Sequence, residues 1–522
     1  MRPSESRRAL WLMVGILLLG AALRFVALEH SPPGLAPDEA TNGYDAYSIA
    51  LTGRDQHGNF LPTVMVSLND YRMPAFIYAA VPFVAALGLS VTSVRMAAAA
   101  CGWLTLPLIY WLGARMFDRP AGLVAALLLA LSPWHLPFSR MGLEGTVVVL
   151  LVTSCVAAFW KWRAAGHRWR WALLAAIIFG LSLYGYAIMK LFTPLLAVGL
   201  GLLFWPDFKA HWRQGLVMIC VIGLMALPVI SDTLRMSELM QARYNQIAVF
   251  SSSRPLKDGV AEALSNWWVH ISPQYLFARG DMDMLQHPPG GGQLYWAQLP
   301  LLLIALAGGA LLPKQRRVSA VLVLWIALSG IPVALTHLNA PGSGHSLRSI
   351  QAVVPWQILS AAGFALAWNM RRKWRAALVL FLIVGLAAQA VPYLRYYFTG
   401  YPAKVALRFD DRMPQAAQAM DVYDDDYDFV GFTDQASWPY LHILFFTRYD
   451  PRLLQLDLPA RGPEMFAPVT RVGKYHIGDV ERMYHEMEHG LFVMPEWMLP
   501  GVEPLAITCR SNGAPAFKIV GK

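Results

Sequence analysis

Charged residues are scarce in this chain. Asp, Glu, Lys and Arg make up 15% of its 522 residues, whereas a soluble globular protein carries about 25%. Hydrophobic residues make up 56% of the chain, and the mean hydropathy is +0.41. This composition excludes a soluble protein, and the long apolar runs predict a polytopic α-helical membrane protein.

Cysteine is also scarce, and its placement excludes two kinds of site. Of the four cysteines, Cys101, Cys155 and Cys220 lie inside apolar runs, where a thiol behaves as a small hydrophobic group. Cys509 stands alone in a polar region. We therefore expect neither a disulfide framework nor a cysteine-based metal site.

Basic residues outnumber acidic ones, and the net charge is +10. They fall in short clusters between apolar runs, as cytoplasmic turns of membrane proteins do. No basic patch with interleaved aromatic residues stands apart from these runs, so nucleic acid is excluded as a partner. Residues 1–8 are basic and no small-residue cleavage site follows them, so we expect an uncleaved first span with a cytoplasmic N-terminus.

Apolar windows predict about eleven membrane spans. They are expected at residues 10–28, 95–114, 121–137, 145–162, 171–189, 192–206, 214–231, 297–312, 317–336, 350–369 and 375–394.

A further apolar segment, residues 74–92, would reverse the side of every later turn if it crossed the membrane. Four basic clusters would then lie outside, against the positive-inside rule: residues 161–170, 209–213, 314–317 and 371–375. We therefore predict that residues 74–92 form a non-spanning, interfacial helix.

The spans also predict the domain organisation. Residues 1–394 are expected to form a transmembrane catalytic domain, with external loops at 29–73 and 232–296. In the first of these loops, residues 38–51 have helical spacing, with Gly53 as the expected helix end. Residues 395–522 contain an acidic run, and their apolar segments shorten to strand length, which predicts a small external α/β domain.

Pro37-Asp38-Glu39-Ala40 places two adjacent carboxylates about ten residues after the first span. An acidic pair so close to the bilayer calls for an explanation. The predicted topology brings further polar residues to the same external border: Asp70, Arg72, Arg140, Glu144, Lys190, His337, His345 and Arg348. Cations there suit the phosphate of an anionic lipid carrier, and a carboxylate suits removal of a proton from an acceptor hydroxyl.

Structural alternatives stay open for most of this set. An acid can interact with a helix dipole or cap a helix, and a cation can anchor in lipid headgroups or extend to the interface. The acids concerned are Glu39, Asp70 and Glu144, and the cations are Arg72, Arg140, Lys190 and Arg348. His345 shares a helical face with Arg348 at i, i+3, and we favour a structural hydrogen-bonding role for it.

Several of these segments resemble those of the GT-C superfamily. The most similar members are polyprenyl-phosphate-sugar-dependent glycosyltransferases related to protein O-mannosyltransferases and lipid A aminoarabinose transferase (families 39 and 83). The segments are Pro37 to Ala40, Asp70-Tyr71-Arg72-Met73-Pro74, Leu131-Ser132-Pro133 with Ser139-Arg140 and Glu144, Tyr184 to Lys190, and Gly344-His345-Ser346-Leu347-Arg348. The likeness covers nearly all of residues 10–395.

The resemblance implies an inverting transfer of sugar from a polyprenyl-phosphate-linked donor to a hydroxyl of a lipid, glycan or protein. It implies an active site on the external face of the inner (plasma) membrane. Asp38 is the implied base, with Glu39 beside it. Arg72, Arg140, Lys190 and Arg348 are the implied donor-phosphate residues, and Asp70, Glu144, Tyr184 and His345 the implied supporting or acceptor-binding residues. Some relatives bind a divalent metal near the acidic pair, so a metal on Asp38 and Glu39 stays an open expectation.

The alternative is a protein on the same scaffold that binds, ligates or flips a lipid-linked glycan. A transporter is expected to hold ionisable residues in the middle of its spans. The predicted span centres are almost free of such residues, which favours transfer chemistry at the membrane border.

Overall fold

In the computed structural model, the described residues are 3–67, 70–250, 254–338, 340, 342–370, 373, 375–459 and 467–522. Residues 371, 372 and 374 of the last basic cluster lie outside these ranges. The described residues fall into two compact units. Unit 1 comprises Met1–Val26, Ala98–Arg140 and Glu144–Arg395, and unit 2 comprises Ala27–Ala97, Met141–Leu143 and Tyr396–Lys522.

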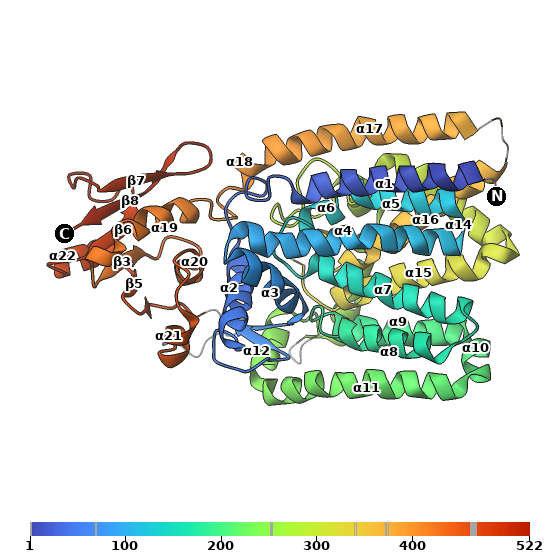
Figure 1. The fold of residues 1–522 in the computed structure, drawn as a ribbon, viewed down its shortest axis with the longest axis horizontal. Helices are drawn as coiled ribbons and strands as arrows, with labels where there is room; N and C mark the ends of the chain where they lie inside the picture. The colour runs from blue at the N-terminus through green and yellow to red at the C-terminus, as the bar shows by residue number, and fades with distance from the viewer. Residues whose placement is uncertain are drawn as a thin grey trace. The chain divides into compact units, whose positions relative to one another are not determined.

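Unit 1 is built from helices that pack side by side (Figure 1). Its longer helices are α1 (Pro3–Phe25), α4 (Val91–Met116, which begins in unit 2), α5 (Arg119–Leu131), α7 (Gly145–Ala164), α8 (Trp169–Ser182), α9 (Met189–Leu203), α11 (Trp212–Arg235), α12 (Ser237–Ile247), α13 (Leu256–Ile271), α14 (Leu299–Leu311), α15 (Pro313–Ala334), α16 (Val353–Met370) and α17 (Arg375–Thr399). Short helices α6 (His135–Phe138) and α10 (Trp205–Ala210) lie between them.

Each of the eleven predicted spans overlaps one of these helices, although the spans predicted at 121–137 and 171–189 extend six and seven residues beyond α5 and α8. Among the described residues, seven helices are long and apolar enough to cross a membrane, and five further apolar helices are shorter. The prediction of a polytopic, helical membrane protein therefore agrees with the structure, whereas the number of crossings stays a prediction.

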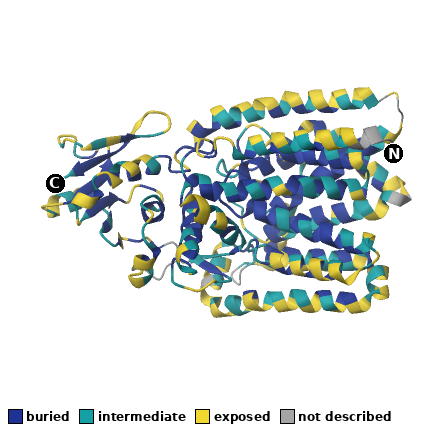
Figure 2. Cartoon of the chain, viewed as in Figure 1, coloured by how far each residue is buried: buried dark blue, intermediate teal, exposed yellow. Residues whose placement is uncertain are grey.

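The outer helices of unit 1 carry the surface expected of a protein in lipid. Figure 2 shows α11 and α17 largely exposed, although both are strongly apolar. Ile219 and Leu227 of α11 and Ile383 of α17 are more than half exposed. By contrast, α7 and α16 are mostly buried inside the unit. A continuous apolar surface of this kind is stable against hydrocarbon rather than water.

The segment predicted not to span, residues 74–92, is a short helix followed by the start of a long one. Helix α3 (Ala75–Leu87) has 13 residues and is therefore about 20 Å long, less than the ~30 Å of a bilayer core. Helix α4 begins at Val91, four residues before the predicted span. The length of α3 agrees with an interfacial helix, whose place at a membrane stays a prediction.

In unit 2, the first polar loop forms helix α2 (Pro37–Thr52) and a hairpin of β1 (Met65–Ser67) and β2 (Asp70–Arg72). Proline is favoured at the first position of a helix, and acids in the first turn suit the helix dipole. Gly53 ends α2 with a φ of 70°, a left-handed conformation that glycine adopts without a steric penalty. This helix and its glycine end were both predicted.

The other part of unit 2 contains a six-stranded mixed sheet in the order β4-β5-β3-β6-β8-β7. Central strand β3 is parallel to β5 and β6, and the remaining neighbours are antiparallel. The strands are β3 (Val430–Thr433), β4 (Arg471–Val472), β5 (Tyr475–Gly478), β6 (Leu491–Pro495), β7 (Ala506–Cys509) and β8 (Pro515–Gly521). Helices α18 (Tyr401–Val405), α19 (Met413–Asp421), α20 (Pro439–Phe446), α21 (Pro451–Leu456) and α22 (Val480–Glu486) accompany it.

This sheet has its own apolar core, because Phe492, Met494 and Val520 pack on one face with Val480 of α22. The α/β character predicted for the last part of the chain is thus present. Its division from residues 1–394 as a domain, and its external location, stay predictions.

Candidate functional site

Asp38 is an exposed carboxylate in the first turn of α2, and an arginine from the β1–β2 hairpin fixes its position. The Asp38 side chain is 66% exposed, whereas that of Arg72 is 12% exposed. Arg72 donates from Nη2 to Asp38 Oδ1 at 2.5 Å and from Nη1 to the Asp38 carbonyl at 3.1 Å. It also donates to Asn42 Oδ1 at 3.0 Å. One predicted acid and one predicted cation are therefore in contact, and the carboxylate is open to an incoming molecule.

Glu39, the next residue, faces the opposite environment. It is fully buried, and its carboxylate accepts two hydrogen bonds from Arg95, from Nε and from Nη2, each at 2.9 Å. It also accepts from the backbone amides of Ala36 at 3.1 Å and Gly142 at 2.6 Å. These four bonds fill the acceptor capacity of a carboxylate.

Arg95 extends this buried contact to the loop that precedes α2. Its Nη1 donates to the carbonyls of Leu28 and Pro32, both at 2.7 Å, and its Nη2 donates to the carbonyl of Gly34 at 2.9 Å. The guanidinium in α4 thus holds the loop and Glu39 at the same time. As a consequence, the Arg95–Glu39 pair fixes where α2 begins, and with it the position of Asp38.

This geometry does not fit a metal ion held by Asp38 and Glu39 together. All four acceptor positions of Glu39 are used inside the protein, and the Asp38 carboxylate points to solvent on the other side of the first turn. Among the described residues, no group of three His, Cys, Asp or Glu side chains could hold a metal.

Glu39 was predicted as catalytic together with Asp38. In this structure its burial keeps the carboxylate from any substrate, so we propose a positioning role for Glu39 instead. Asp70, predicted as a supporting residue or a helix cap, lies in β2 and accepts a hydrogen bond from the Tyr71 amide at 2.8 Å. The N-cap of α3 is Pro74, so Asp70 does not cap that helix.

A second buried acid, Asp45, lies further along helix α2. Asp45 is 1% exposed and accepts from the Gln56 amide at 3.0 Å and from its side chain at 3.2 Å. Burial raises the pKa of Asp45 to about 7, and hydrogen bonds from Gln56 oppose that rise.

Asp45→Asn is expected to flatten the pH dependence of stability between about pH 4 and pH 7. The unfolded carboxyl loses its proton near pH ~3.9, whereas the folded one keeps it up to about 7. Because the folded state binds more protons in this interval, the free energy of unfolding of the wild type falls as pH rises through it. Melting temperatures of the purified protein across this range measure the effect. Exposed Asp425→Asn serves as a control, and an identical slope in wild type and Asp45→Asn would contradict the assignment.

In unit 1, the predicted residues come from three segments of the chain. Arg140 is fully buried and donates to the carbonyls of Leu23 at 2.8 Å and Arg24 at 3.3 Å. Arg24, also fully buried, donates to His135 Nδ1 at 3.1 Å. Glu144 directly precedes α7 and is 8% exposed, which suits an interaction with the helix dipole.

Tyr184 and Lys190 both reach α11. The Tyr184 hydroxyl donates to the Met225 carbonyl at 2.7 Å, and Lys190 Nζ donates to Thr233 Oγ1 at 3.3 Å. Lys190 lies at the start of α9, next to the turn that contains Tyr184. Both side chains therefore contact the same helix, and their roles at the site stay predictions.

His345 and Arg348 lie in a turn whose backbone is hydrogen-bonded to a residue of α13 and to a residue of the segment that follows it. The backbone amides of His345 and Ser346 donate to His270 Nε2 at 3.0 Å and Asp281 Oδ2 at 2.6 Å. Burial holds the pKa of His345 well below its ordinary value, and Arg348 lowers it further. His345 is therefore neutral and buried, as its predicted structural role requires.

Arg348 donates to Thr336 Oγ1 at 2.9 Å and to the His337 carbonyl at 3.2 Å. Glycine is required at position 344, because a Cβ there would lie 2.1 Å from the Tyr275 ring. The segment Gly344 to Arg348 is thus a turn that is fixed by hydrogen bonds, and its one cation is Arg348.

Asp38, Glu39 and Arg72 were predicted from the sequence, whereas the residues that contact Glu39 and Arg72 were not. Asn42, Gly142 and Arg95 were not selected, although a lone arginine near the start of an apolar run was a readable signal. In unit 1, Arg24 was not predicted either, although it too is a single arginine in an apolar run.

The model of the family described as dolichyl-phosphate-mannose-protein mannosyltransferase matches residues 73–234. No curated protein sequence matches the chain.

Two solved structures share the fold. ArnT from Cupriavidus metallidurans, bound to undecaprenyl phosphate, is 12% identical with a TM-score of 0.58, and the alignment covers 98% of this chain and 97% of ArnT. Archaeal oligosaccharyltransferase AglB from Archaeoglobus fulgidus, in complex with an inhibitory peptide and a dolichol-phosphate, is 14% identical with a TM-score of 0.54 over 85% of this chain. The chain spans 64% of the length of AglB. The resemblance to GT-C membrane glycosyltransferases is therefore confirmed, as a likeness of fold.

Proposed function

We propose that this chain is an inverting glycosyltransferase that moves a sugar from a polyprenyl-phosphate-linked donor to an acceptor hydroxyl at the external face of the plasma membrane. The fold shared with ArnT and AglB, and the family match over residues 73–234, support a GT-C glycosyltransferase in general. Undecaprenyl phosphate and dolichol-phosphate in those two structures support a lipid-linked donor.

The observation that carries this proposal is the asymmetry of the acidic pair. Asp38 is exposed and aligned by Arg72, whereas Glu39 is enclosed by Arg95. A base must be open to its substrate, and the residues that position it must be rigid. Asp38 meets the first requirement, because it is open to a substrate, and the adjacent Glu39 meets the second, because it is held rigidly.

In the proposed reaction, Asp38 accepts the proton of the acceptor hydroxyl as its oxygen forms a bond to C1 of the sugar. The C1–O bond to the donor phosphate breaks at the same time, and polyprenyl phosphate leaves with the bonding electrons. Attack from the side opposite the phosphate inverts C1, and no covalent enzyme intermediate is needed. Arg72 keeps the carboxylate oriented through its two hydrogen bonds.

The departing phosphate gains negative charge, which a cation can stabilise. We assign this role to Lys190 and Arg348, which the predicted topology puts on the external side. Arg140 is buried and donates to backbone carbonyls, so we give it a structural role. Glu144, Tyr184 and Asp70 remain proposed supporting residues.

Transfer by the purified full-length chain in liposomes tests the proposal. The donors are a panel of radiolabelled polyprenyl-phosphate sugars, and the product is analysed by NMR for the configuration at C1. We expect release of polyprenyl phosphate together with a product of inverted configuration. A retained configuration contradicts single displacement. Donor binding without any turnover across the panel would favour the alternative of a binding or flipping protein.

A further inference from the structure

A cavity of about 780 Å³ lies within unit 1, between α8, α9, α10 and α11. Its floor is buried and apolar, formed by Ala176, Phe179 and Met218. Its rim is open, because Trp205 and Trp212 are about 60% exposed. The proposed transfer reaction uses no residue of this cavity.

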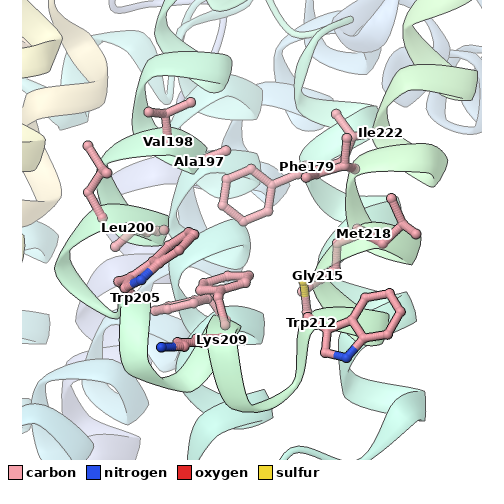
Figure 3. Close-up of a pocket in the computed structure, with 18 residues that line it drawn as sticks. Phe179, Ala197, Val198, Leu200, Trp205, Lys209, Trp212, Gly215, Met218 and Ile222 are labelled. Carbon is pink, nitrogen blue, oxygen red and sulfur yellow. The ribbon is translucent and has the colours of Figure 1, made fainter.

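The cavity has a polar end and an apolar end. Figure 3 shows Trp205, Lys209 and Trp212 together at one end, with Ala197 and Val198 at the other. Lys209 is the one charged residue among the described residues that line it. Indole rings prefer the boundary between hydrocarbon and headgroups. The polar end of the cavity therefore suits a lipid headgroup, and the apolar end suits an acyl chain.

The surroundings of the polar end are strongly cationic. Two contacts join the end of α7 to α10 and to the first turn of α11: Trp162 Nε1 donates to Gln214 Oε1 at 2.6 Å, and Arg163 Nε donates to Asp207 Oδ2 at 2.5 Å. The basic residues of α7, α8, α10, α11 and the turn between α7 and α8 in this part of the chain are Lys161, Arg163, Arg168, Arg170, Lys209 and Arg213. Asp207, the one acid between residues 160 and 213, is paired with Arg163, so the local charge favours an anionic headgroup.

Small side chains keep the cavity open. Gly201 lines it, and a Cβ added there would meet nothing within 4 Å. An apolar cavity of this kind cannot hold well-bonded water. Exposed apolar residues around its rim, such as Leu216 and Ile219, indicate that hydrocarbon is the adjacent medium.

We propose that this cavity binds an acyl chain of an anionic phospholipid, with the lipid phosphate against Lys209. A polyprenyl tail is the competing occupant. A donor phosphate near Lys190 would be about 10–18 Å from the cavity residues of α9, measured along that helix, so its tail could reach the cavity. A tail alone gives no role to Lys209 or to the cationic end. Charge at position 209 therefore distinguishes the two occupants.

Photocrosslinking of the full-length protein in nanodiscs tests the proposal. The probes are phosphatidylglycerol and phosphatidylcholine with a diazirine in the acyl chain, and a diazirine-labelled polyprenyl phosphate. We expect phosphatidylglycerol to label peptides of α8, α9 or α11 about fivefold more than phosphatidylcholine, the effect of roughly one lysine at a membrane surface. Lys209→Gln should remove this preference, and Lys209→Arg should keep it.

Gly201→Phe should lower the labelling by occupying part of the cavity, and Gly223→Phe on exposed α11, where a Cβ also meets nothing within 4 Å, should leave it intact. Equal labelling by the two phospholipids, preferential labelling by the polyprenyl probe, or an unchanged preference in Lys209→Gln would each overturn the proposal. Lys209 is exposed, so its variants fold and the test stands even if Gly201→Phe does not.

Discussion

Asp38→Asn is expected to lower kcat for sugar transfer by about 10²- to 10⁴-fold, the usual contribution of a general base. Asparagine has the same shape and can still accept the hydrogen bond from Arg72, but it cannot take a proton. Because the side chain is 66% exposed, stability should change by no more than about 0.5 kcal/mol. Initial rates at saturating donor, together with melting temperatures, measure both effects.

Two companion variants sharpen this experiment. Asp425→Asn alters an exposed acid outside the proposed site and should leave the rate unchanged. Arg72→Met removes the hydrogen bonds that align Asp38 and should lower the rate while leaving the base in place. Full activity of Asp38→Asn, in a protein that folds normally, would refute its assignment as the base.

The second large effect is expected at the buried pair. Glu39→Gln or Arg95→Met should each lower the free energy of unfolding by about 3–5 kcal/mol, because either change leaves a buried charge without its partner. Both side chains of this pair are 0% exposed, so solvent cannot compensate. The double variant should cost less than the sum of the two single variants, because it removes both charges.

Unfolding in detergent, followed for the wild type, both single variants and the double variant, gives the coupling energy. Glu486→Gln removes an exposed ion pair with Arg482 and should leave the melting temperature unchanged. Additive losses for Glu39 and Arg95, or losses as small as that of Glu486→Gln, would contradict a shared buried pair. A lower kcat in any single variant that still folds would support the positioning role of Glu39.

The sequence alone located the long apolar helices, although not their exact limits, and it did not predict helices α12 and α13 in residues 232–296. Span position depends on local apolar composition, so each predicted span overlaps a helix. The start of α2 at Pro37 and its end at Gly53 follow from the conformational preferences of proline and glycine in the chain itself. Asp38 and Arg72 were identified for a similar reason, since polar residues beside apolar runs are visible without knowledge of packing.

Only the tertiary structure decided how the acidic pair divides its roles. Successive helix residues point in different directions, but the sequence does not say which direction is buried. That depends on Arg95 and Gly142, which lie 56 and 103 residues after Glu39. The same holds for the turn at His345, whose partners are His270 of α13 and Asp281, 75 and 65 residues earlier in the chain. Long-range contacts leave little trace in local composition, and they separate Asp38, open to a substrate, from Glu39, which is enclosed within the protein.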